Sequence, residues 1–150
     1  SVTSFVEFTA LSIWNMPMSL AGLNKMGEGN MLAYLDIEFT EIGEEYLVAK
    51  MPVTAKVKQP MGLLHGGANV VLAESLASCA SYCVAGKDAM VVGVEINANH
   101  LKAVRHGEVF ATASPIKLGK TLHVWQIDIH QNSDLVCSSR LTVMVKSKSI

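Results

Sequence analysis

The chain has 150 residues, a formal net charge of −1, 50% hydrophobic residues and 17% charged residues. This length suits one domain, and the near-neutral charge excludes a general electrostatic attraction to nucleic acid or to anionic lipid. The mean hydropathy of +0.33 is high. We therefore expect a large core and a further buried surface, most simply an oligomer interface.

The first third of the chain alternates apolar segments with turn residues. A short helix is expected there, with Ser19 as its N-cap and Gly27 as its end. Two strands follow, and then an irregular segment that contains Pro60 and Gly62. We expect the helix at residues 18–26, the strands at 31–42 and 46–53, and the irregular segment at 54–64.

A long apolar helix and four further strands complete the chain. The helix is expected to begin near His65 and to end near Ala85, with Gly86 just after its C-terminus. Turn residues separate four strand-like runs, which we expect to form a meander at residues 90–101, 108–117, 121–130 and 135–145. One apolar helix and a mostly antiparallel sheet imply an α+β architecture in which the sheet wraps the helix.

Glu74 is the only acid within the long apolar helix. A carboxylate in a core helix is costly unless it is paired or used in chemistry, so Glu74 is the first candidate catalytic residue. Its presence also argues against a membrane span. The alternative is a carboxylate paired with lysine or exposed at a helix edge. Ser78, four residues later, shares the same face and either hydrogen-bonds there or merely packs, as do Ser75 and Ser81.

Gly66 and Gly67 stand at the expected start of this helix. Free backbone N–H groups and the helix dipole make that end a natural site for a carbonyl oxygen that gains negative charge. Glu74 lies eight residues further on, roughly 12 Å along the axis. A base or nucleophile must come within about 3–3.5 Å of the reacting carbon. If both ends are catalytic, they come from different chains, as in a two-fold dimer.

Cysteine usage and the N-terminus favour a cytoplasmic protein. Cys79, Cys83 and Cys137 are too few for a disulfide framework and lack metal-ligand spacing, so we expect reduced thiols and no metal site. The first residues lack the features of a secretory signal. We assign no function to residues 1–11 and treat residues 12–150 as a single domain.

Residues 59–68 read Gln-Pro-Met-Gly-Leu-Leu-His-Gly-Gly-Ala, and residues 72–75 read Leu-Ala-Glu-Ser. These motifs resemble the signature of hotdog-fold acyl-CoA thioesterases of the PaaI-like group. Within that group the chain looks most like the 1,4-dihydroxy-2-naphthoyl-CoA thioesterases of menaquinone synthesis, with the proofreading thioesterases of enterobactin synthesis as near relatives. The segments that carry this closer resemblance are residues 26–30, 92–100, 124–127 and 137–142.

The resemblance implies a six-stranded antiparallel sheet around a central helix, a dimer with adjacent helices, and a tetramer of two dimers. It implies Glu74 as nucleophile or general base, and the Gly66 N–H of the other subunit as the group that polarises the thioester carbonyl. Gln59 and His65 would line that carbonyl, and Ser78 would position the acyl group or water. The implied contacts to the pantetheine arm and nucleotide of CoA are Gly93, His100, Leu101, Lys102, Ala103, Lys117, Leu118, Gly119, Lys120, Thr121 and Leu122.

Each implied role has a simpler structural alternative. His65 would only cap or orient the loop, Gln59 would only satisfy backbone groups, and His100 would be solvated at a strand end. The loop lysines would clamp phosphate groups or merely carry solvated charge. The remaining histidines match no motif, and we interpret them as ordinary turn or strand residues: His106, His123 and His130.

The sequence therefore predicts a homodimeric or homotetrameric thioesterase that hydrolyses an aromatic CoA thioester, with 1,4-dihydroxy-2-naphthoyl-CoA as the leading substrate and no metal or redox cofactor. A broad-specificity or aryl carrier-protein proofreading thioesterase is the alternative. A hydratase or dehydratase would need a further histidine motif, and a non-catalytic acyl-CoA-binding protein would bind without turnover. Met61 stands where the family usually has phenylalanine, and we expect it to alter aromatic selectivity.

Overall fold

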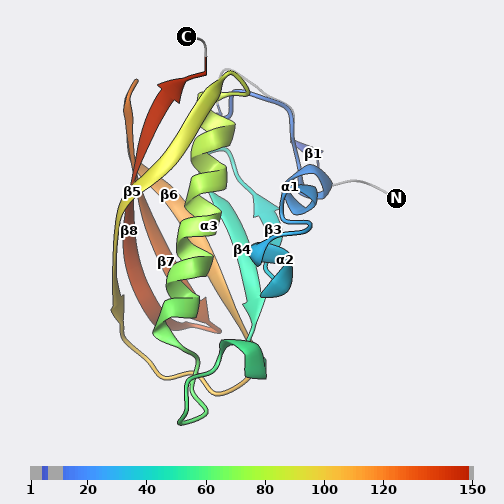
Figure 1. The fold of residues 1–150 in the computed structure, drawn as a ribbon, viewed down its shortest axis with the longest axis vertical. Helices are drawn as coiled ribbons and strands as arrows, with labels where there is room; N and C mark the ends of the chain where they lie inside the picture. The colour runs from blue at the N-terminus through green and yellow to red at the C-terminus, as the bar shows by residue number, and fades with distance from the viewer. Residues whose placement is uncertain (1–4, 7–11, 149–150) are drawn as a thin grey trace.

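A computed structural model of the chain describes residues 5–6 and 12–148 (Figure 1). A curved sheet of six antiparallel strands wraps one long helix, α3 (Gly66–Ala85). The predicted fold class, a six-stranded antiparallel sheet around a central helix, is confirmed. In the order β3-β4-β6-β7-β8-β5, the strands are Glu38–Ile42, Leu47–Pro52, Glu108–Leu118, Leu122–Gln131, Asp134–Ser147 and Ala89–His100.

The expected boundaries of α3 are confirmed at both ends. His65 is the N-cap, and its side chain accepts the N–H of Gly67. Gly86 follows the helix with a φ of 99°, a conformation that favours glycine. Among the described residues, α3 is the helix whose length and apolarity match a membrane span, and 50% of its most apolar window is buried inside the chain. The surrounding sheet accounts for the buried half of that window.

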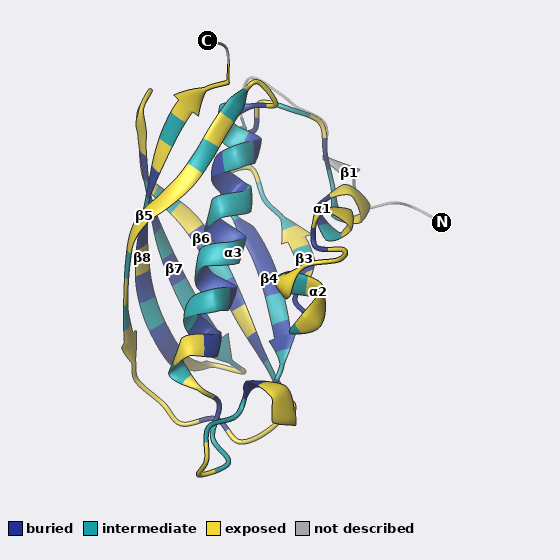
Figure 2. Cartoon of the chain, viewed as in Figure 1, coloured by how far each residue is buried: buried dark blue, intermediate teal, exposed yellow. Residues whose placement is uncertain are grey.

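The core lies between α3 and the concave face of the sheet (Figure 2). Alternate residues of a strand point to opposite faces, and β7 follows this rule, with Trp125, Ile127 and Ile129 fully buried. Leu72 and Leu76 of α3 are fully buried against this face. This packing fixes which side of α3 faces the sheet and which side stays available for a site.

Smaller elements lie near the N-terminus. Phe5–Val6 (β1) pairs with Met18–Ser19 (β2), which leads directly into α1 (Leu20–Met26). Ser19 caps α1 as predicted, and Gly27 is its C-cap. Apart from Phe5 and Val6, the segment 1–11 that we interpreted as an extension lies outside the described residues.

The predicted strand at residues 31–42 is wrong in its first half. Met31–Tyr34 forms one helical turn, α2, because the side chain of Asn30 accepts the N–H of Leu32 and caps it. Asp36 then adopts a φ of 59° and redirects the chain into β3. The irregular segment before α3 holds one short 3₁₀ turn, Ala55–Val57.

The predicted meander of four strands is also wrong in its order. Strands β6, β7 and β8 form a meander, but β5 pairs with β8 alone among the described strands and forms the edge of the sheet. The chain crosses from the end of β5 beneath the start of α3 before it enters β6 beside β4 (Figure 1). This crossing brings residues 100–103 to the N-terminal end of α3.

Candidate active site

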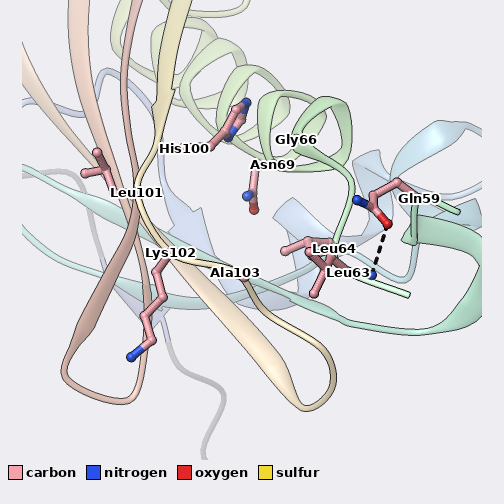
Figure 3. Close-up of a pocket in the computed structure, with 9 residues that line it drawn as sticks. All are labelled: Gln59, Leu63, Leu64, Gly66, Asn69, His100, Leu101, Lys102 and Ala103. Atoms are coloured by element: carbon pink, nitrogen blue, oxygen red, sulfur yellow. Dashed lines mark hydrogen bonds between the residues drawn. The ribbon is translucent and has the colours of Figure 1, made fainter. Parts of the chain in front are cut away.

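A cavity of about 340 Å³ lies at the N-terminal end of α3 (Figure 3). Three segments form its wall: the loop before α3, the first turns of α3, and the chain that leaves β5. The structure thus gathers several of the predicted site residues in one place. The lining residues are Gln59, Leu63, Leu64, Gly66, Asn69, His100, Leu101, Lys102 and Ala103.

Gln59 holds the loop that leads to α3. Its Oε1 accepts the N–H of Met61 at 2.6 Å and the N–H of Leu63 at 3.2 Å. The expected alternative role, satisfaction of backbone groups, is therefore present in the structure. The side-chain amide nitrogen of Gln59 points away from these two N–H groups (Figure 3). Met61 itself is 75% exposed and does not line the cavity.

His65 caps the helix, as its structural alternative predicted. Its Nδ1 lies 2.7 Å from the N–H of Gly67 and accepts that hydrogen bond. An accepting Nδ1 carries no proton, so the proton of the neutral ring sits on Nε2. The cap ties one of the N–H groups at the start of α3, and the imidazole is exposed beside the cavity.

Gly66 and His100 are in close contact across the cavity. A Cβ atom on Gly66 would lie 2.5 Å from Nε2 of His100, so no larger residue fits there without displacing the imidazole. N–H groups in the first turn of a helix have no partner within the helix and carry the positive end of its dipole. This end of the cavity is therefore suited to a carbonyl oxygen.

Glu74 is half-buried on α3, and its carboxylate rests against Gly93 of β5. A Cβ on Gly93 would lie 2.5 Å from Oε2 of Glu74, and the pairing of β5 with β8 shifts register between Gly93 and Glu95. The carboxylate of Glu74 makes no hydrogen bond or ion pair with any residue in the described part of the chain. Neither Glu74 nor Ser78 lines the cavity at Gly66. A single chain therefore does not bring the Glu74 carboxylate and the Gly66 N–H to the same point.

Apart from Gly93, which lies against Glu74, the predicted CoA contacts fall at two separate places in the chain. His100, Leu101, Lys102 and Ala103 line the cavity, although Lys102 also forms a 2.6 Å ion pair with Asp134. Residues 117–122 span the end of β6, the β6–β7 turn and the start of β7. Leu122 and Val92 both pair with Met144, so this turn lies about 26 Å along β5 from His100.

Strand β5 presents an unpaired edge beside Glu74. Met90, Val92 and Val94 are 49%, 42% and 53% exposed. An exposed apolar edge strand is a template for pairing with another chain. The apolar surplus noted in the composition is thus concentrated, in part, on the edge that adjoins Glu74.

Comparison with known proteins identifies the family. Residues 61–138 match the thioesterase superfamily. The chain is 51% identical over 134 residues to the 1,4-dihydroxy-2-naphthoyl-CoA hydrolase of Escherichia coli, a match that covers 89% of this chain and 98% of that relative. The chain belongs to the thioesterase superfamily.

Further comparisons agree with this assignment. The chain is 41% identical over 134 residues to the proofreading thioesterase EntH of Cronobacter turicensis, covering 89% of this chain and 98% of that relative. A crystal structure of a thioesterase from Haemophilus influenzae superposes with a TM-score of 0.89 and 42% identity, covering 92% of this chain and 97% of that one. The predicted hotdog fold and the prediction of a thioester hydrolase are confirmed.

Two buried polar features of this thioesterase were missed by the sequence interpretation. Asn69 lines the cavity one turn after Gly66 and is 3% exposed. Only its spacing of three from Gly66 signalled this position. His123, which we interpreted as an ordinary strand residue, is buried against α3, with Nδ1 3.0 Å from Oγ of Ser81.

The cysteines of the thioesterase are free thiols, as predicted. Burial raises the pKa of Cys79 to about 11 and that of Cys83 to about 12, so both stay protonated near neutral pH. Within residues 5–6 and 12–148, no three His, Cys, Asp or Glu side chains cluster in a way that would hold a metal ion. The cofactor-free reaction stays a prediction.

Proposed function

We propose that this thioesterase hydrolyses aromatic acyl-CoA thioesters to the carboxylic acid and free CoA, with 1,4-dihydroxy-2-naphthoyl-CoA as its leading substrate. The supporting observation is the unpaired, half-buried carboxylate of Glu74 on the same helix whose first turn opens on a cavity. The choice of acyl group rests on the 51% identity to a 1,4-dihydroxy-2-naphthoyl-CoA hydrolase.

In the proposed mechanism the thioester carbonyl accepts a hydrogen bond from the Gly66 N–H at the positive end of α3. This contact strengthens as negative charge develops on the oxygen. Glu74 either removes a proton from the attacking water or attacks the carbonyl carbon itself to form an anhydride that water then cleaves. In both routes the C–S bond breaks, the oxygen of water enters the acid, and the sulfur leaves as the thiol of CoA.

The proposal requires two chains at each site. Gly66 and Glu74 of one chain are separated by about 12 Å along α3. Two-fold pairing of β5 edges would set the two α3 helices side by side and bring Glu74 toward the Gly66 of the partner subunit. The same operation would carry the β6–β7 turn, with Lys117 and Lys120, toward the partner's cavity. A homodimer, assembled further into a homotetramer in the cytoplasm, is the assembly that we propose.

A broad-specificity or carrier-protein proofreading thioesterase is the second candidate. The 41% identity to a proofreading thioesterase favours it, as does the outward position of Met61, which adds no aromatic wall to the cavity. Both candidates use the same thioester chemistry and differ only in the acyl group and its carrier.

The decisive experiment measures kcat/KM for a panel of thioesters with the wild type, Glu74→Ala and Glu74→Gln. The panel holds 1,4-dihydroxy-2-naphthoyl-CoA or its 1-hydroxy analogue, benzoyl-CoA, a dihydroxybenzoyl carrier-protein thioester, and short and long aliphatic acyl-CoAs. Loss of the carboxylate should lower kcat by about 10²–10⁴-fold without unfolding the protein, because a positioned base or nucleophile is removed.

The matched control is Glu44→Gln, a change at an exposed turn, which should keep normal turnover. A preference for the naphthoyl thioester supports the leading substrate, and a flat profile supports the broad-specificity candidate. Near-normal hydrolysis by Glu74→Ala would overturn the mechanism, whereas thioester binding without turnover in the wild type would indicate a binding protein.

A further inference from the structure

Asn69 is the polar side chain of the cavity that has an unpaired buried atom. The residue is 3% exposed, and its Oδ1 has no hydrogen-bond donor among the described residues. A carbonyl oxygen buried without a donor is unfavourable, and native proteins rarely keep one unless something else supplies the hydrogen bond. An explanation is therefore required for a carboxamide at this position.

The side chain lies where a ligand in the cavity would meet it. Asn69 follows Gly66 by three residues, so the two occupy the same side of α3. Figure 3 shows the carboxamide projecting from α3 toward the space between His100 and Leu64. It stands about one helical turn further along α3 than the N–H groups at the start of the helix.

Several other polar side chains around this end of α3 already have partners. Oε1 of Gln59 accepts two backbone N–H groups, Nδ1 of His65 accepts the N–H of Gly67, and Nζ of Lys102 pairs with Asp134. Asn69 differs from these three residues because no group in residues 5–6 and 12–148 donates to its oxygen. The missing donor is thus to be sought in the ligand.

We propose that the carboxamide of Asn69 binds the amide of the thiol arm, the one separated from the thioester sulfur by two CH₂ groups. This inference rests on the proposed function, since every CoA or carrier-protein thioester carries that amide. A secondary amide offers one donor and one acceptor, and a carboxamide can match either, because rotation about its last torsion exchanges oxygen and nitrogen. The Asn69 contact would hold the arm while the Gly66 N–H binds the thioester oxygen.

The spacing of the two contacts suits that arm. Gly66 and Asn69 are separated by about 4.5 Å along the axis of α3. The two CH₂ groups between sulfur and amide nitrogen span a similar distance. Asn69 is therefore placed to select thiol arms that carry an amide at this position and to set the depth at which the thioester carbonyl stops.

The test compares two small thioesters of one acyl group that differ in a single atom. One is the thioester of N-acetylcysteamine, and the other is the thioester of 2-acetoxyethanethiol, in which an ester oxygen replaces the amide N–H. The wild type should favour the amide by about tenfold in kcat/KM, as expected for one hydrogen bond to an otherwise unpaired buried group. Asn69→Leu should lower kcat/KM for the amide more than for the ester, so that the variant hydrolyses the two at equal rates.

Asn15→Leu is the matched control, because Asn15 lies at the opposite end of α3, where its side-chain amide donates a hydrogen bond to the carbonyl of Ala85. This variant should keep the amide preference. A wild-type ratio near one overturns the inference even if Asn69→Leu fails to fold. An equal loss by Asn69→Leu on both thioesters assigns Asn69 a structural role instead and also overturns it. Absence of wild-type turnover on every thioester, CoA derivatives included, refutes the proposed function as well.

Discussion

Asn69 and Ser81 are both buried polar residues on α3, about three turns apart, and they differ in their partners. The Oγ of Ser81 accepts the indole N–H of Trp125 at 2.6 Å and lies 3.0 Å from Nδ1 of His123. Oδ1 of Asn69 has no donor among the described residues. The later turns of α3 are thus joined to β7 by a hydrogen-bond cluster. The first turns instead face a cavity in which Oδ1 of Asn69 can still accept a hydrogen bond.

On the proposed function, this difference should separate stability from activity along one helix. A buried polar group whose partners are all present rigidifies the fold, and its removal leaves those partners unpaired. A buried polar group without a partner contributes nothing comparable to the folded state. Changes in the first turns of α3 should therefore affect catalysis, and changes near Ser81 should affect the free energy of unfolding.

Gly66→Ala should have the largest effect at the N-terminal end. The added methyl group would lie 2.5 Å from Nε2 of His100 and would displace the imidazole from its present position beside the Gly66 N–H. We expect kcat/KM to fall by about 10²–10³-fold, as for the loss of one oxyanion contact. Stability should change little, since His100 is an exposed side chain that can turn.

Steady-state kinetics and thermal unfolding of the same preparations check this prediction. Gly22→Ala, which changes a glycine in α1 far from the cavity, is the control and should keep full activity. A Gly66→Ala protein with normal kinetics would show that access of the substrate to the start of α3 does not limit turnover.

Ser81→Ala should have the opposite profile. It leaves the indole N–H of Trp125 and Nδ1 of His123 without a partner in the core. We expect the free energy of unfolding to fall by about 1–3 kcal/mol, with kcat/KM per folded molecule unchanged. Guanidinium titration measures the first quantity, and Ser75→Ala, a half-buried serine on the same helix, should stay within about 0.5 kcal/mol of wild type. A stable Ser81→Ala protein would contradict the role of the cluster.

Acid should weaken the same cluster by a smaller amount. Burial lowers the pKa of His123 below its ordinary value of 6.5. When the pH falls below 6.5, His123 binds a proton in the unfolded chain but not yet in the folded chain. The free energy of unfolding therefore falls as the pH falls, until the pH reaches the lower pKa of the folded state. The slope from this one group is at most about 1.4 kcal/mol per pH unit.

Unfolding titrations of wild type and His123→Asn between neutral pH and pH 5 isolate this contribution. Asparagine does not titrate but can still bond Ser81, so the variant should lose stability less steeply than wild type across that range. Equal slopes in the two proteins would show that His123 is not the residue that senses the acid.

The sequence predicted the helix and the fold class well because their signals are local. The apolar run between His65 and Gly86 fixes the length of α3, and alternating residues in β7 fix its buried face. The strand at residues 31–42 failed because Asn30 and Asp36 act through a side-chain cap and a left-handed backbone conformation. Neither of these two local devices interrupts the apolar character of the segment.

The lining of the cavity was predicted in part, and the catalytic roles stay predictions. Spacing alone separated Gly66 from Glu74, and the structure places Gly66, His100 and Gln59 around a cavity that excludes Glu74. Asn69 was not predicted, because a single asparagine in a helix carries no sign of burial or of missing partners. The contact of Glu74 with Gly93 was equally hidden, since it depends on which strand lies against which side of α3.

By itself, the sequence determined the elements that arise from short-range patterns: the long helix with its single acid, the strands, and the glycine-rich entry that resembles thioesterases. Only the tertiary structure decided that β5 lies at the edge and that residues 100–103 meet the start of α3. It also decided that Oγ of Ser81 has hydrogen-bond partners, whereas Oδ1 of Asn69 has no donor among the described residues. The reason is physical. Periodicity and capping act within a few residues, whereas burial and hydrogen-bond partners depend on segments far apart in the chain that only folding brings together.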